Sequence, residues 1–121
     1  MNAALFLSAL LTWGAVHFIA DFAFQSAWMA MMKSPLQNDG KVDKPNEVLL
    51  YHCLTYTATY VVFAKTFAIS VNPWAYIVIF LAHVVVDWHK ARKRIVKTIW
   101  LDQILHLLTL VPLILMDWLP P

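Results

Sequence analysis

Three pairs of ionisable residues interrupt otherwise apolar stretches of this sequence, and the members of each pair are four residues apart. The pairs occur in the segments HFIAD, HVVVD and DQILH, and their members are His17, Asp21, His83, Asp87, Asp102 and His106. On an α-helix, residues at this spacing share one face and lie about 6 Å apart along the axis. Each pair therefore presents an imidazole and a carboxylate together, the donor types that suit zinc, iron or manganese.

A fourth histidine, His52, begins a polar stripe in another apolar segment. Thr55, Tyr56 and Thr59 follow it at the i+3, i+4 and i+7 positions. This spacing places all four side chains on one helical face. We expect that face to point toward the three pairs, so that His52 is either a further metal ligand or a general base.

The helices that position these residues are predicted from hydropathy. Of the 121 residues, 61% are hydrophobic and only 13% are charged, whereas a soluble domain carries about a quarter charged residues. Four stretches approach the roughly 20 apolar residues that cross a bilayer: about residues 3–24, 48–70, 73–92 and 99–119. The sequence therefore predicts an all-α, polytopic membrane protein, a single antiparallel bundle of four transmembrane helices over residues 1–121.

Basic residues predict the orientation of this bundle, because Lys and Arg are retained on the cytoplasmic side of a membrane. They gather in the loop between the first two spans and in the loop between the last two: Lys33, Lys41, Lys44, Lys90, Arg92, Lys93, Arg94 and Lys97. We expect both loops in the cytoplasm and both termini outside. His then precedes Asp in the helices that run inward and follows Asp in the helix that runs outward. In space, each Asp would lie nearer the cytoplasm than its histidine.

This arrangement predicts a site in the cytoplasmic half of the bundle that holds one or two divalent ions, which would be zinc, manganese or iron. The expected ligands are His17, Asp21, His52, His83, Asp87, Asp102 and His106. Three of them are also predicted to take part in catalysis, namely His52, Asp87 and Asp102. Polar and basic side chains would contact an anionic substrate at the mouth of the site; these are Gln25, Lys90, Arg94 and Gln103.

The combined motifs resemble a family of small bacterial and phage integral-membrane proteins described only as a domain of unknown function, number 3307. Its pattern joins an early H-x-x-x-D-x-x-x-Q, a central His, an H-x-x-x-D and a late D-Q-x-x-H, which here read HFIADFAFQ, His52, HVVVDWHK and DQILH. The resemblance covers almost the whole chain and implies no particular activity. The architecture is also similar in style to inner-membrane proteins predicted to be metal-dependent hydrolases.

Three functions are compatible with these residues. The first is a membrane-embedded, metal-dependent hydrolase acting on a lipid or phosphorylated amphiphile of the cytoplasmic leaflet, where bound metal activates water. The second is a transporter or relay for metal ions or protons. The third is a non-enzymatic phage or bacterial membrane adaptor whose polar core fixes helix pairing. The bilayer is an expected partner in each case and a homo-oligomer is compatible, while the net charge of +2 gives no indication of a nucleic-acid partner.

Overall fold

Helices account for the regular structure of the computed structural model, which describes residues 1–93, 96 and 98–121. They are α1 (Ala3–Phe18), which continues into the π-helical segment η1 (Ile19–Ala23), then α2 (Ala27–Met32), α3 (Pro45–Thr66), α4 (Pro73–Lys93) and α5 (Ile99–Leu115). The described residues contain no strand. The all-α prediction is therefore confirmed.

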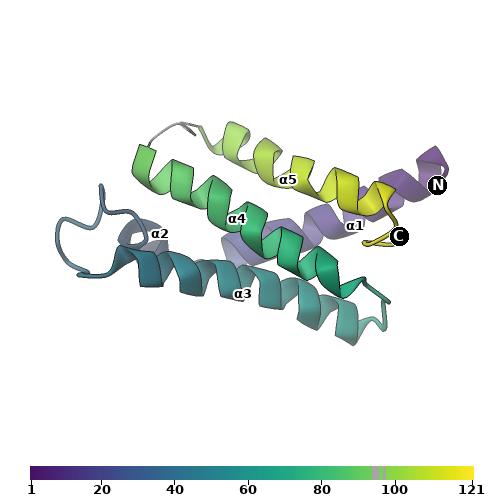
Figure 1. Cartoon of the computed structure of the whole chain (residues 1–121), viewed down its shortest axis with the longest axis horizontal. Helices are drawn as coiled ribbons and strands as arrows, with labels where there is room; N and C mark the ends of the chain where they lie inside the picture. The colour runs from purple at the N-terminus through teal and green to yellow at the C-terminus, as the bar shows by residue number, and fades with distance from the viewer. Residues whose placement is uncertain (94–95, 97) are drawn as a thin grey trace.

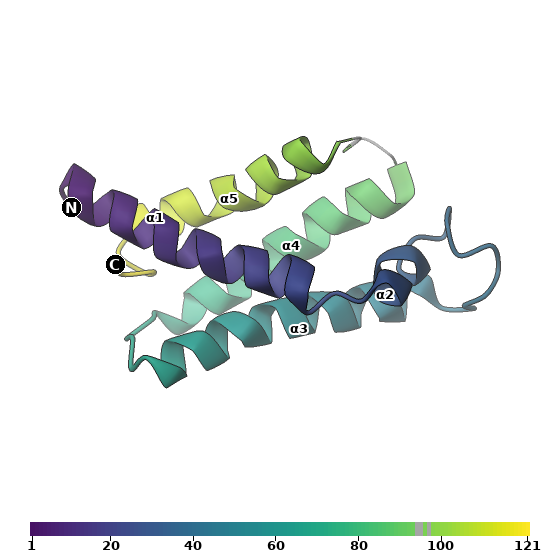
Figure 2. The ribbon, with the colours of Figure 1, turned by 180° about the vertical axis from the view of Figure 1, so that it is seen from behind.

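The four long helices form a closed ring, in which each helix contacts two neighbours. The contacts join α1 to α3, α3 to α4, α4 to α5 and α5 back to α1. Neighbours in the ring run in opposite directions, and the N-terminus lies at the same end as the C-terminus (Figures 1 and 2). The short helix α2 lies outside the ring, beside the start of α3. The interior of the ring is thus shared by all four long helices.

Local sequence signals determine where these helices begin. Asn2, Ser26 and Thr98 cap α1, α2 and α5, since the side chain of each accepts a hydrogen bond from a backbone N–H in the first turn. Proline opens the other two helices, as Pro45 in α3 and Pro73 in α4, where its fixed φ suits the first helical turn. Helix α3 consequently starts before residue 48, where the apolar run of the predicted second span begins.

One helical segment of the described residues is long and apolar enough to cross a bilayer. This is the continuous α1–η1 segment, Ala3–Ala23, with 21 residues and a mean hydropathy of 1.8. It lies near the N-terminus, and a signal sequence or a buried core helix would share these properties. Helix α5 is apolar but ends at Leu115, earlier than the predicted fourth span. A four-span topology therefore remains a prediction.

An aromatic and aliphatic core fills the end of the ring that holds the two termini. The Trp13 ring stacks on the Tyr60 ring, with centroids 6.0 Å apart and planes 5° from parallel. Both side chains are fully buried, together with Leu110, Leu113 and other aliphatic residues. The Trp13 indole N–H also donates to the Pro120 carbonyl, 2.7 Å away, which holds the C-terminal residues against the bundle. The polar residues lie in the other half.

Candidate metal centre

All seven predicted ligands lie inside the ring, in the half opposite the aromatic core. They are His17 from α1, Asp21 from η1, His52 from α3, His83 and Asp87 from α4, and Asp102 and His106 from α5. None of these residues is more than 6% exposed. Residues far apart in the chain are thus gathered into one buried cluster, which we call the His/Asp cluster.

The histidine rings form a continuous row across the bundle. Ring centroids are 4.9 Å apart between His52 and His83, 4.5 Å between His83 and His106, and 5.3 Å between His106 and His17. Tyr56 stacks on the His83 ring with centroids 3.7 Å apart. The carboxylates lie along this row.

Asp21 is positioned by the π-helical segment, which the sequence did not indicate. In this wider turn, the backbone N–H of Phe24 donates to the carbonyl oxygen of Ile19, 3.3 Å away and five residues earlier. Single π-turns within helices occur frequently at functional sites. The Asp21 carboxylate in this turn lies 3.3 Å from the Nε2 atom of His52.

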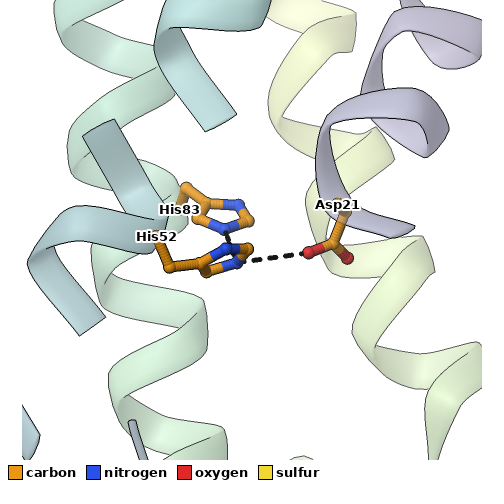
Figure 3. Close-up of side chains that lie close together, drawn as sticks. All are labelled: Asp21, His52 and His83. Atoms are coloured by element: carbon orange, nitrogen blue, oxygen red, sulfur yellow. Dashed lines mark hydrogen bonds and ion pairs between the residues drawn. The ribbon is translucent and has the colours of Figure 1, made fainter. Parts of the chain in front are cut away.

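The Nε2 atom of His52 is a point where several possible ligands meet. It lies 3.0 Å from Nε2 of His83 and 3.3 Å from Oδ1 of Asp21 (Figure 3). Oδ2 of Asp87 is also 3.3 Å away. Donor atoms in a tetrahedral zinc site are about 3.4 Å apart, because each lies about 2.0–2.1 Å from the ion. The observed separations therefore fit donors that share one ion.

Three overlapping groups of residues could hold a metal ion, since one ligand atom from each member lies within 4.8 Å of the others. The groups are Asp21, His52 and His83; His83, Asp87 and His106; and Asp21, Asp102 and His106. In the second group, Oδ2 of Asp87 lies 3.7 Å from Nε2 of His83, and Oδ1 of Asp87 lies 3.9 Å from Nε2 of His106. The imidazole and carboxylate donors suit the predicted zinc, manganese or iron.

Three buried atoms of the cluster have no hydrogen-bond partner among the described residues, namely Nδ1 of His83, Nε2 of His106 and Oδ1 of Asp102. The last two offer lone pairs to the interior of the cluster. The other ring nitrogen of His106 lies 2.8 Å from the Asp102 carbonyl oxygen, so Nδ1–H donates there and Nε2 keeps a lone pair. Because buried polar atoms are normally hydrogen-bonded, these unshared lone pairs are the strongest local indication of a cation ligand.

His17 occupies a different place from the other three histidines. Its Nδ1 lies 2.7 Å from the Tyr56 hydroxyl and its Nε2 lies 2.7 Å from Oε1 of Gln103. Since an amide oxygen can only accept, Nε2–H donates to Gln103 and Nδ1 accepts from Tyr56. His17 belongs to none of the three metal-compatible groups. The structure thus does not bring it into the ligand set that the sequence predicts.

Gln103 links His17 to two carboxylates. Its Nε2 atom donates to Oδ2 of Asp21 at 3.1 Å and to Oδ2 of Asp102 at 3.3 Å. The residue is 6% exposed, so it lies inside the cluster rather than at a mouth where substrate would arrive. Hydrogen bonds to the ligands of a metal hold those ligands in position in proteins, and we interpret the bonds of the Gln103 amide to Asp21 and Asp102 in this way.

Lys33 enters the cluster from the segment that follows α2. Its ammonium group contacts Oδ2 of Asp87, and the side chain is 6% exposed. The adjacent Ser34 hydroxyl donates to the Ala91 carbonyl oxygen at 2.8 Å, which fixes the segment on α4. The sequence indicated a topological role for Lys33 but not this contact, because nothing in a loop sequence shows that a side chain returns to the bundle interior.

The other three predicted substrate contacts, besides Gln103, lie in different surroundings. Lys90 pairs its ammonium group with Oδ2 of Asp102 and is 39% exposed, so it lies at the edge of the cluster. Gln25 is half-buried in the connection between η1 and α2, with Nε2 2.8 Å from Nε2 of His52. Arg94 lies outside the described residues.

Comparison with known proteins identifies a family for this chain. No curated protein and no solved structure matches it. A family model described as a protein of unknown function, DUF3307, matches residues 6–119, a range that includes every member of the His/Asp cluster. That description names neither an activity nor a membrane location. The chain belongs to the DUF3307 family of proteins of unknown function.

Proposed function

We propose that this protein is a membrane-embedded, metal-dependent hydrolase acting on a lipid or phosphorylated amphiphile at the cytoplasmic leaflet. The observation that carries the proposal is the His/Asp cluster, in which buried donor atoms from several helices lie at the separations of metal ligands. On insertion scales, an Asp at the centre of a membrane helix costs about 2.5–3.5 kcal/mol, and such residues are normally functional. Three carboxylates in one cluster therefore support a chemical role.

The distribution of apolar side chains supports the membrane part of the proposal. Large hydrophobic residues are exposed on every long helix, for example Leu11 at 66%, Val62 at 63%, Leu81 at 55% and Leu108 at 57%. Exposed apolar surface of this extent is characteristic of contact with lipid or protein. Helices α3 and α4 carry members of the cluster, and these ionisable residues lower their mean hydropathy. The described helices thus enclose a polar cluster in one half of the bundle and expose apolar side chains on the outside.

Cysteine labelling tests the predicted topology. In a Cys53→Ala background, Gln37→Cys places a thiol between α2 and α3, and Ser70→Cys places one between α3 and α4; both positions are exposed. With four spans, a membrane-impermeant maleimide is expected to label position 70 from outside and position 37 only after the membrane is opened. Labelling of both positions from the same side would contradict the four-span topology.

The residues of the chain have distinct roles in this proposal. Asp21, His83, Asp87, Asp102 and His106 would hold the ion. His52 would be either a further ligand or the base that accepts a proton from water. Bound divalent metal supplies a Lewis acid and makes water a nucleophile near neutral pH. At the edge of the cluster, the partly exposed Lys90 would attract the anionic group of the substrate.

Hydrolysis of dioctanoyl phosphatidic acid in mixed micelles tests the activity. Released phosphate reports phosphoryl transfer to water, and released fatty acid reports acyl hydrolysis. We expect Asp87→Asn to lower the rate by about 100-fold or more, a typical contribution of one catalytic group, and His89→Ala to leave it unchanged. His89 is the matched control because it lies on α4 outside the three groups. Failure of the wild type to hydrolyse either bond would overturn the choice of this substrate class.

A proton or metal-ion relay is the second candidate, and one chain of hydrogen bonds favours it. The Tyr60 and Tyr56 hydroxyls are 3.1 Å apart, and Tyr56 continues to His17. This chain leads from the cluster toward the aromatic core, where the Tyr60 hydroxyl lies 3.5 Å from the Trp13 carbonyl oxygen. Proton flux in proteoliposomes without lipid hydrolysis would favour the relay over the hydrolase.

A further inference from the structure

We infer that the His/Asp cluster has two cation positions joined by bridging carboxylates, so that each chain binds two divalent ions. This inference rests on the metal binding proposed above and adds the number and arrangement of the ions. The first position lies among Asp21, His52 and His83, and the second among Asp21, Asp102 and His106. These two groups share one residue, Asp21.

A carboxylate can serve both positions, whereas an imidazole nitrogen has one lone pair and serves one ion. Asp21 directs Oδ1 toward His52, at 3.3 Å, while its Oδ2 accepts from the Gln103 amide that also bonds Asp102. The two oxygens of Asp87 also face different histidines. Its Oδ2 lies 3.3 Å from Nε2 of His52, and its Oδ1 lies 3.9 Å from Nε2 of His106. Each of these carboxylates therefore presents one oxygen to each position.

A single ion would not satisfy the donors that the helices place here. An ion held by Asp21, His52 and His83 leaves Nε2 of His106 and Oδ1 of Asp102 as buried acceptors without a partner among the described residues. An ion at the second position leaves three acceptors to share the single proton that Nε2 of His52 can carry, namely Nε2 of His83, Oδ1 of Asp21 and Oδ2 of Asp87. An ion held by His83, Asp87 and His106 leaves Oδ1 of Asp102 without a partner among the described residues. Two ions engage both sets of donors.

The lysines fit the same division, with one lysine beside each position. Lys33 contacts Asp87, next to His52, and Lys90 contacts Asp102. Asp21, Asp87 and Asp102 carry three negative charges, which the four positive charges of two divalent ions would more than balance. The two ammonium groups are then no longer needed at the carboxylates. Lys33 lies on the segment outside the helix ring and Lys90 at the partly exposed edge, so both can turn to an anionic substrate.

Manganese stoichiometry and electron paramagnetic resonance test this inference. Protein stripped with chelator and reloaded with Mn²⁺ is expected to retain two ions per chain, and a bridged pair gives an exchange-coupled spectrum. One ion per chain with the spectrum of isolated Mn²⁺ would overturn the inference but keep the proposed metal binding. No retained ion would overturn both. Because this measurement uses the wild-type protein, it does not depend on the folding of any variant.

Single substitutions test the assignment of ligands to positions. His52→Ala and His106→Ala are each expected to reduce the stoichiometry from two ions to one and to remove the exchange coupling, since each histidine serves one position. His89→Ala, a histidine of α4 outside the three groups, is expected to retain two coupled ions. Retention of a coupled pair in either cluster variant would overturn the assignment.

Discussion

A protein carrying both His83→Ala and Asp21→Ala is expected to purify without bound metal. His83 belongs to two of the three metal-compatible groups and Asp21 to two, and together they occur in all three. The double variant therefore removes a ligand from every group, whereas any single substitution leaves at least one group whole. Elemental analysis of detergent-purified protein, prepared without chelator, measures the result as metal per chain.

The matched control replaces the same residue types outside the cluster. His89→Ala with Asp43→Ala removes one histidine and one aspartate that belong to none of the groups, and Asp43 is exposed. This control is expected to keep the metal content of the wild type. If the His83/Asp21 double variant retained as much metal as the control, the ligand set described above would be wrong. Circular dichroism establishes that both proteins keep their helices.

In protein stripped of metal, the largest loss of stability is expected for Asp87→Leu. This substitution leaves the Lys33 ammonium buried without its partner, and both side chains of the pair are less than a tenth exposed. Removing one member of a buried ion pair destabilises a protein by about 3–5 kcal/mol. Unfolding in detergent, followed by circular dichroism, measures the change in the free energy of unfolding.

Restoring the charge balance should recover most of that loss. The double variant Lys33→Met/Asp87→Leu replaces the pair with apolar side chains of similar length, a change that is often neutral or stabilising in buried pairs. We expect its free energy of unfolding to lie well above that of Asp87→Leu alone. Equal stability of the single and double variants would mean that Lys33 does not depend on Asp87 in the folded protein.

Periodicity explains how much of this structure the sequence could predict. Apolar runs indicated the four long helices, and the four-residue spacing gave direct contacts within two of the three pairs, namely His83 with Asp87 and Asp102 with His106. These contacts depend only on α-helical geometry, which is the same in every helix. A match over residues 6–119 agrees with the family resemblance that the motifs indicated.

Departures from regular α-helix explain what could not be predicted. Asp21 lies in a π-helical turn and contacts His52, and no pattern in HFIAD distinguishes such a turn from a regular one. The pairing of Lys33 with Asp87 depends on the path of an irregular connection. The engagement of His17 with Gln103 depends on how α1 and α5 face each other. These are tertiary properties, which spacing along one helix does not contain.

The division of the bundle into an aromatic half and a polar half has a mechanical consequence. At the end with the termini, the four long helices share one apolar core. In this core the Trp13 ring stacks on the Tyr60 ring, and the Trp13 indole N–H donates to the Pro120 carbonyl. At the opposite end, charge pairs and hydrogen bonds around the cluster join the helices. In the proposed function, these contacts are exchanged for contacts with ions or an anionic head group. We therefore expect the end with the termini to stay fixed, and the helices at the opposite end to adjust their spacing when the ionisable side chains change partners.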